Sequence, residues 1–150
     1  MTGTYLLWVC WLFFNAGAGR TIVNRPIYNI PQMTIMNSII SGSTNSLIVY
    51  FLYPRLVNKD SNSAINVCNG VLSGLVSITG SCNNVENYSA FVIGVIGGFV
   101  FILSCRLMER LKIDDPCSAS QIHCFCGFWG ALAVGIFERE KGLIYSGDFK

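Results

Sequence analysis

The sequence predicts an all-α membrane protein with five transmembrane helices. Its 150 residues are 52% hydrophobic and only 12% charged, with a mean hydropathy of +0.51, whereas globular domains carry about 25% charged residues. Its ten Lys and Arg and eight Asp and Glu residues sit in narrow clusters. Between the clusters lie five charge-free windows, at residues 1–19, 26–54, 61–85, 87–105 and 116–137. Each can hold a helix of the roughly twenty residues that cross a hydrocarbon core about 30 Å thick.

The first span is expected near residues 5–19 and is short for a full crossing. No Lys or Arg precedes it, so it lacks the basic region of a secretory signal peptide. The chain closes on a polar stretch, KGLIYSGDFK. Both ends therefore look interrupted, and we expect residues 1–150 to be one partial domain, truncated at both ends.

The other four windows predict one span each. These spans are expected near residues 32–54, 65–81, 90–107 and 117–137. Asp114 and Asp115 precede the last of them, and Pro116 suits its first turn. We expect these three residues to form a structural cap, because carboxylates favour the positive end of a helix dipole and proline fits a first helical turn.

Small and polar residues recur inside the spans. In lipid there is little hydrophobic drive between helices, so close backbone approach and hydrogen bonds from Ser, Thr and Asn must hold a bundle together. The stretch SIISGSTNS in the second window suits the hydrogen-bonding role. The glycines expected at helix contacts are Gly70 with Gly74, Gly94 with Gly97 and Gly98, and Gly127 with Gly130.

The positions of Lys and Arg predict an orientation. Among the short internal loops, those after the second and fourth windows carry five Lys and Arg residues, against two in the other loops. The positive-inside rule therefore places residues 55–64 and 106–115 in the cytoplasm. Arg139, Lys141 and Lys150 belong to the opposite side, and when they are included each side carries five Lys and Arg residues.

The composition excludes several classes of function. A net charge of +2 without a basic stripe gives no nucleic-acid surface. Five spans leave little chain outside the membrane and no room for a soluble catalytic domain. We therefore expect neither an enzyme nor a bound cofactor.

Five sequence blocks, in this order, resemble the ammonium transporter (Amt/Rh) family. They are WLFFNAG at 11–17, the Asn37-Ser38 pair, CNGVLSGLVSITGSC at 68–82, GVIGG at 94–98 and DDPCSASQIHCFCGFWGALAVGIF at 114–137. The third and fifth blocks are highly specific, and the resemblance covers nearly the whole chain. It implies an eleven-helix fold built from two inverted halves, of which this sequence is similar to helices six to ten.

The resemblance also implies a function. It predicts transport of ammonium or ammonia across the membrane, as part of a full-length channel-like transporter. The expected setting is that of a multi-pass protein among membrane lipids, and the resemblance implies the plasma membrane. The full-length protein would be a homotrimer, with one conduction path between the two halves of each protomer.

His123 is the only histidine and lies in the middle of the last window. An imidazole in hydrocarbon needs a hydrogen-bond partner and usually faces a cavity or a proton path, although a packing role is equally expected from the residue alone. The resemblance implies that His123 lines the pore as one of a facing pair that handles ammonium deprotonation. The facing histidine belongs to the first half, which this sequence does not contain.

Three residues of the first span complete the expected site. Aromatic residues in a span are by default core or lipid-facing, but the resemblance implies that Phe14 narrows the outer vestibule as a gate. Such a ring can offer a cation–π face to ammonium. Trp11 and Leu7, one and two helical turns earlier, match pore-lining positions beneath this gate.

The sequence departs from the family pattern at two positions. Ala18 stands where the family often has a serine that helps to recruit the cation, which weakens the expected outer site. Cys124 follows His123 where the family commonly has glycine, so a bulkier side chain would crowd the pore.

Two alternatives to a transporter remain open. The first is a non-conducting, truncated membrane fragment that keeps the fold but lacks the path. The second is a small membrane metal or redox protein using His123, Cys124 and Cys126. A C-x-C pair beside one histidine lacks the paired spacing of a structural zinc site, so no metal site is expected.

Overall fold

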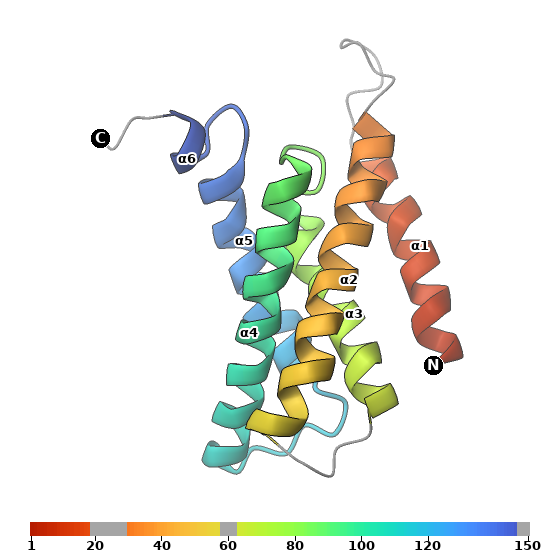
Figure 1. The fold of residues 1–150 in the computed structure, drawn as a ribbon, viewed down its shortest axis with the longest axis vertical. Helices are drawn as coiled ribbons and strands as arrows, with labels where there is room; N and C mark the ends of the chain where they lie inside the picture. The colour runs from red at the N-terminus through yellow and green to blue at the C-terminus, as the bar shows by residue number, and fades with distance from the viewer. Residues whose placement is uncertain (19–29, 58–62, 147–150) are drawn as a thin grey trace.

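Five long helices run up and down in chain order, each antiparallel to the one before it (Figure 1). This computed structural model describes residues 1–18, 30–57 and 63–146. The helices are α1 (Thr2–Ala18), α2 (Ile30–Leu56), α3 (Ser63–Thr79), α4 (Asn87–Leu111) and a fifth that starts as a π-helix, η2 (Ser120–Phe125), and continues as α5 (Cys126–Phe137). A short helix, α6 (Leu143–Ser146), follows. The described ranges contain no strand.

The helices lie where the charge-free windows predicted spans, which confirms the all-α fold. By length and composition, three described helices can cross a membrane: Pro31–Leu56, Asn87–Leu111 and Ser120–Phe137. The other two, α1 and α3, have 17 residues each. Residue 19, the expected end of the first span, lies outside the described residues.

The predicted fifth span was wrong at its start. Instead of beginning at residue 117, the helix begins after Ser118, whose φ of 53° lies in the left-handed region. Pro116 therefore sits in a turn before the helix and not in its first turn. The reason is that the chain folds back on Asp115, whose carbonyl accepts a hydrogen bond from the Ser118 N–H at 3.0 Å.

Polar side chains of α2 bond to the helices on either side of it. The Asn15 amide of α1 donates to Ser38 Oγ at 2.9 Å, within the buried part of the bundle. Ser41 Oγ donates to the Gly74 carbonyl of α3 at 2.9 Å. These bonds confirm that the polar residues of the second window hold helices together.

Two asparagines extend this pattern along α2. Asn37 Nδ2 donates to the carbonyls of Cys82 and Val85, both at 2.9 Å, and so fixes the turn between α3 and α4. In the amide orientation that satisfies both of its ends, Asn45 donates to the Gly70 carbonyl at 3.1 Å and accepts from the Gly98 N–H at 3.1 Å. Asn45 therefore links α2 to α3 and to α4.

Close backbone contacts accompany these hydrogen bonds. A Cβ added at Gly74 or at Gly94 would lie 2.7 Å from the Ser41 carbonyl oxygen, so α3 and α4 both approach the same turn of α2. A Cβ added at Gly130 would lie 2.8 Å from the Ser77 carbonyl oxygen, so α5 approaches α3 as closely. The predicted role at helix contacts is confirmed for Gly74, Gly94 and Gly130, but it was wrong for Gly127, where an added Cβ would meet only Val76 Cγ1 within 4 Å, at 3.7 Å.

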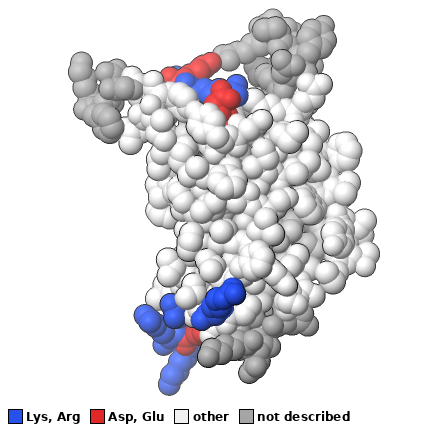
Figure 2. All heavy atoms as spheres, viewed as in Figure 1, with Lys and Arg blue, Asp and Glu red and all other residues white. Residues whose placement is uncertain are grey.

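Charged side chains gather at the two ends of the bundle and leave its middle uncharged on the face that Figure 2 shows. The ends of α2 and α4 lie at one end (Figure 1), with Arg55, Arg106, Arg110 and Lys112. At the other end, Arg139 Nε pairs with Glu86 Oε1 at 2.7 Å. The side of the membrane that each end faces stays a prediction, and Arg20, Arg25, Lys59 and Lys150 lie outside the described residues.

The close contact at Gly94 allows the helix packing to be tested. We expect Gly94→Ala to lower the free energy of unfolding by about 1–3 kcal/mol, because the new methyl group overpacks the Ser41 backbone. Gly135→Ala is the matched control, since a Cβ there meets nothing within 4 Å. Thermal unfolding of the purified protein in detergent measures both, and equal stability of the two variants would contradict the close contact.

Candidate functional site

One face of α1 carries the three residues that the sequence predicts for the path. Leu7, Trp11 and Phe14 follow one another at helical spacing, and together with Cys10 they line an apolar groove of about 260 Å³. Phe14 is 64% exposed and Leu7 49% exposed. These side chains therefore project away from the described bundle, on a face that it does not cover.

A second groove contains His123. It has a volume of about 300 Å³ and lies between α1, α3 and the fifth helix. Its lining is Trp11, Val76, Thr79, Gly80, His123, Gly127, Gly130 and Ala131. Trp11 lines both grooves, so the structure brings Trp11 and His123 together. Leu7 and Phe14 line only the first groove, which is connected to the His123 groove by the shared residue Trp11.

The Trp11 indole is fixed from α3. Its Nε1–H donates to Thr79 Oγ1 at 2.8 Å. The Thr79 hydroxyl in turn donates to the Leu75 carbonyl at 2.7 Å. Sequence reasoning did not select Thr79 or Val76; the one available signal was that both lie in the specific block at 68–82.

His123 lies on the π-helix, where the backbone makes a wider turn. The Cys126 N–H bonds to the Gln121 carbonyl, five residues earlier, and Gln121 and Ile122 are buried. The His123 side chain is exposed and its imidazole makes no hydrogen bond to the part of the chain that the structure describes. The charge pattern predicted a regular helix here, and π turns of this kind occur frequently at functional sites.

Small residues keep the His123 groove open. Gly127 lies one turn after His123, and the nearest atom that a Cβ there would meet is Val76 Cγ1 at 3.7 Å. Ala131 continues the same face. The groove therefore has space beside the imidazole because its neighbours have little or no side chain.

The cysteines near His123 point in different directions. Cys126 is buried with its Sγ 3.8 Å from the Gly97 carbonyl, whereas Cys124 is exposed. Cys124 does not line the His123 groove, so the expected crowding by this residue is not seen among the described residues. Within the described ranges, no three His, Cys, Asp or Glu side chains come together to hold a metal ion.

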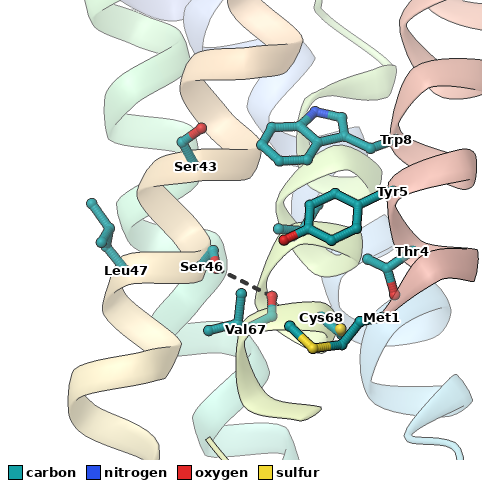
Figure 3. Close-up of a pocket in the computed structure, with 10 residues that line it drawn as sticks. Met1, Thr4, Tyr5, Trp8, Ser43, Ser46, Leu47, Val67 and Cys68 are labelled. Atoms are coloured by element: carbon teal, nitrogen blue, oxygen red, sulfur yellow. Dashed lines mark hydrogen bonds between the residues drawn. The ribbon is translucent and has the colours of Figure 1, made fainter. Parts of the chain in front are cut away.

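A third groove opens on a different face of α1 (Figure 3). Met1, and Tyr5 and Trp8 of α1, line it together with Ser46 of α2 and Cys68 of α3, and its volume is about 260 Å³. Sequence reasoning selected none of its lining residues for function. The side chain of Ala18, the position where the family often has serine, lies outside what the structure describes.

The cap predicted for the fifth helix is confirmed at Asp115. Its carboxylate accepts the Ser120 N–H at 2.7 Å and the Ala119 N–H at 3.1 Å. These bonds, that from Ser120 first, hold the pKa of Asp115 below its ordinary value. Asp115 thus fixes the start of the helix that carries His123.

Comparison with known proteins assigns the chain to a family. The model of the Ammonium Transporter Family matches residues 1–149. The chain belongs to the ammonium transporter family. This family consists of transporters, and together with the apolar helices it makes the chain a multi-pass membrane protein.

Individual relatives agree. The chain is 39% identical to ammonium transporter 1 member 2 of Arabidopsis thaliana, over 97% of this chain and 30% of that protein. The crystal structure of Saccharomyces cerevisiae Mep2 superposes with a TM-score of 0.79 and 29% identity, over 91% of this chain and 29% of that chain. Rh50 of Nitrosomonas europaea superposes with a TM-score of 0.70 and 28% identity, over 88% and 34%. The chain thus spans about a third of the length of these relatives.

The Asp115 cap predicts a pH dependence. A carboxyl group whose pKa is lowered by folding stabilises the folded state above its ordinary pKa, and this contribution is lost as the pH falls through the lowered pKa. Hydrogen exchange at the amides of Ala119 and Ser120 should therefore speed up, relative to other helix starts, on acidification to that range. Asp115→Asn keeps an acceptor oxygen and should remove the pH dependence; an unchanged profile in this variant would assign it to another group.

Proposed function

We propose that this chain forms one wall of a path that carries ammonium or ammonia across a membrane, within a longer channel-like transporter. The observation that carries the proposal is the position of Trp11, which lines both the Leu7–Phe14 groove and the His123 groove. The residues that the family resemblance selected thus follow one another along one side of the bundle. Membership of the ammonium transporter family supports the choice of substrate.

His123 is the group in this path that can exchange a proton. Apart from the Thr79 hydroxyl, its groove is lined by apolar side chains, glycines and alanine. Moving a charged ammonium ion through such a space is costly, and deprotonation to ammonia removes the charge. A neutral imidazole with no hydrogen bond to the described residues can accept that proton and pass it on.

Phe14 is the proposed outer gate. Its ring is exposed at the end of the Leu7–Phe14 groove farther along α1 from the N-terminus. The face of an aromatic ring attracts a cation, so Phe14 can hold ammonium briefly before the ion loses its proton. Trp11 and Leu7 then line the apolar stretch beyond the gate.

The proposal requires a second wall. The exposed faces of Leu7, Phe14 and His123 are the ones that another half of the transporter would cover. In the complete protein we propose a homotrimer in the plasma membrane, with a separate path in each protomer. The competing possibility is that the chain is a non-conducting fragment, and that possibility predicts a different result in the next experiment.

A chimaera tests the path directly. Residues 1–150 replace the matching segment of the Arabidopsis relative, and uptake of ammonium is measured in cells without transporters of their own. We expect the chimaera to restore uptake, residues 1–150 alone to restore none, and His123→Ala to remove most of the chimaera's uptake because the imidazole relays the proton.

Each result is normalised to the amount of protein at the cell surface. A chimaera that reaches the surface but conducts nothing would favour the non-conducting fragment. Robust uptake by residues 1–150 alone would show that no second wall is needed.

Filling the groove provides a steric test. We expect Gly127→Leu in the chimaera to abolish most uptake, because its side chain would occupy the space beside His123. Gly135→Leu is the matched control on the same helix, since its Cβ meets nothing within 4 Å. Equal uptake by the two variants at equal surface amounts would mean that the His123 groove is not the path.

A further inference from the structure

The Trp11 indole is held by a side chain, which sets it apart from the two other tryptophans. Trp129 Nε1 donates to the Ile93 carbonyl at 3.1 Å, which is a backbone partner. Trp8 Nε1 is buried without a partner among the described residues. Trp11 Nε1 donates to the hydroxyl of Thr79 at 2.8 Å. The orientation of this ring therefore depends on the identity of one other residue.

Thr79 is arranged to accept that bond. A threonine hydroxyl has one proton to donate, and Thr79 uses it on the Leu75 carbonyl at 2.7 Å, four residues earlier in α3. The lone pairs of Oγ1 are then left for the indole N–H. Leu75 is fully buried, so this end of the chain of two hydrogen bonds is fixed in the core.

The Trp11 ring stands where its orientation matters for passage. Trp11 is the residue that both grooves share, and Thr79 lines the groove that also contains His123. The other residues around His123 include Gly80, Gly127 and Ala131, which have no side chain that could turn into the space. The indole is the bulkiest group at this junction, and a rotation of its ring changes the width there.

We propose that Thr79 is a positioning residue that sets the size discrimination of the path by holding the Trp11 indole in one orientation. The proposal rests on the proposed function of the same site. Without the Thr79 acceptor, the ring can turn away from the junction and admit a larger substrate molecule. Methylammonium, which is ammonium with one hydrogen replaced by a methyl group, is the probe for such widening.

The test uses Thr79→Val in the chimaera, which keeps the shape of the side chain and removes the acceptor. We expect the ratio of methylammonium to ammonium uptake to rise by about fivefold, the size that corresponds to one lost neutral hydrogen bond. Thr79→Ser keeps the hydroxyl and should retain the original ratio. Thr4→Val, on the α1 face that lines the third groove, is the control for a Thr→Val exchange and should also leave the ratio unchanged.

A second background shows whether Thr79 acts through Trp11. Trp11→Phe already lacks the indole N–H, so adding Thr79→Val to it should change the ratio no further. If Thr79→Val does not reach the surface, Thr79→Ala takes its place in both backgrounds. An unchanged ratio in a conducting, His123-dependent chimaera, or an equal further change in the Trp11→Phe background, would overturn the positioning role. Failure of the chimaera to conduct at all would instead overturn the proposed function.

Discussion

The hydrogen bonds that α2 makes to its neighbours determine where α1, α3 and α4 lie. In lipid there is little hydrophobic driving force for helices to associate. Buried polar groups and close backbone contacts must therefore hold the helices together. Ser38 accepts from Asn15 of α1, Ser41 donates to α3, and Asn37 donates to the turn between α3 and α4. A polar group without a partner is costly in an apolar interior. Each bond therefore fixes the position of the neighbouring helix along the bundle as well as its distance from α2.

The candidate site depends on this arrangement although none of its members is on α2. Ser41 and Gly74 fix α3, and α3 then presents Thr79 to Trp11 and Val76 to the His123 groove. The close contact of Gly130 with the Ser77 backbone places the fifth helix against α3. The groove is thus the space that remains between helices whose separation is determined elsewhere.

The charge pattern of the sequence was enough to predict the helices, because a buried charge is so costly that its absence marks a span. Helix contacts at Gly74, Gly94 and Gly130 were predictable for the same physical reason, since few other residues permit such close approach. His123 could be singled out as the one histidine in the middle of a charge-free window, but its role in the pore, and the selection of Trp11, came only from the family resemblance. Nothing in the hydropathy distinguishes Trp11 from Trp8, which lines another groove.

The π-helix and the Thr79 contact escaped prediction because both depend on tertiary structure. A π turn has no composition of its own, and the sequence SQIHCF is compatible with a regular helix. The bond between Trp11 and Thr79 joins residues 68 positions apart, which no local pattern reports. The start of the fifth helix was missed because the left-handed backbone of Ser118 is unusual for a residue that is not glycine.

The π turn also determines the angular phase of the fifth helix. Each residue of an α-helix rotates by about 100° around the axis, so one additional residue in a single turn offsets everything before it relative to everything after it. The helix is secured on both sides of this turn, by the Asp115 carboxylate before it and by the Arg139–Glu86 pair beyond its end. Loss of one residue between Ser120 and Phe125 would therefore rotate the part of the helix before this turn relative to α5. The packing of α5 would stay intact, but the imidazole of His123 would no longer lie on the same face as Gly127 and Ala131. The length of this six-residue segment, as much as its composition, keeps the histidine in register with the groove.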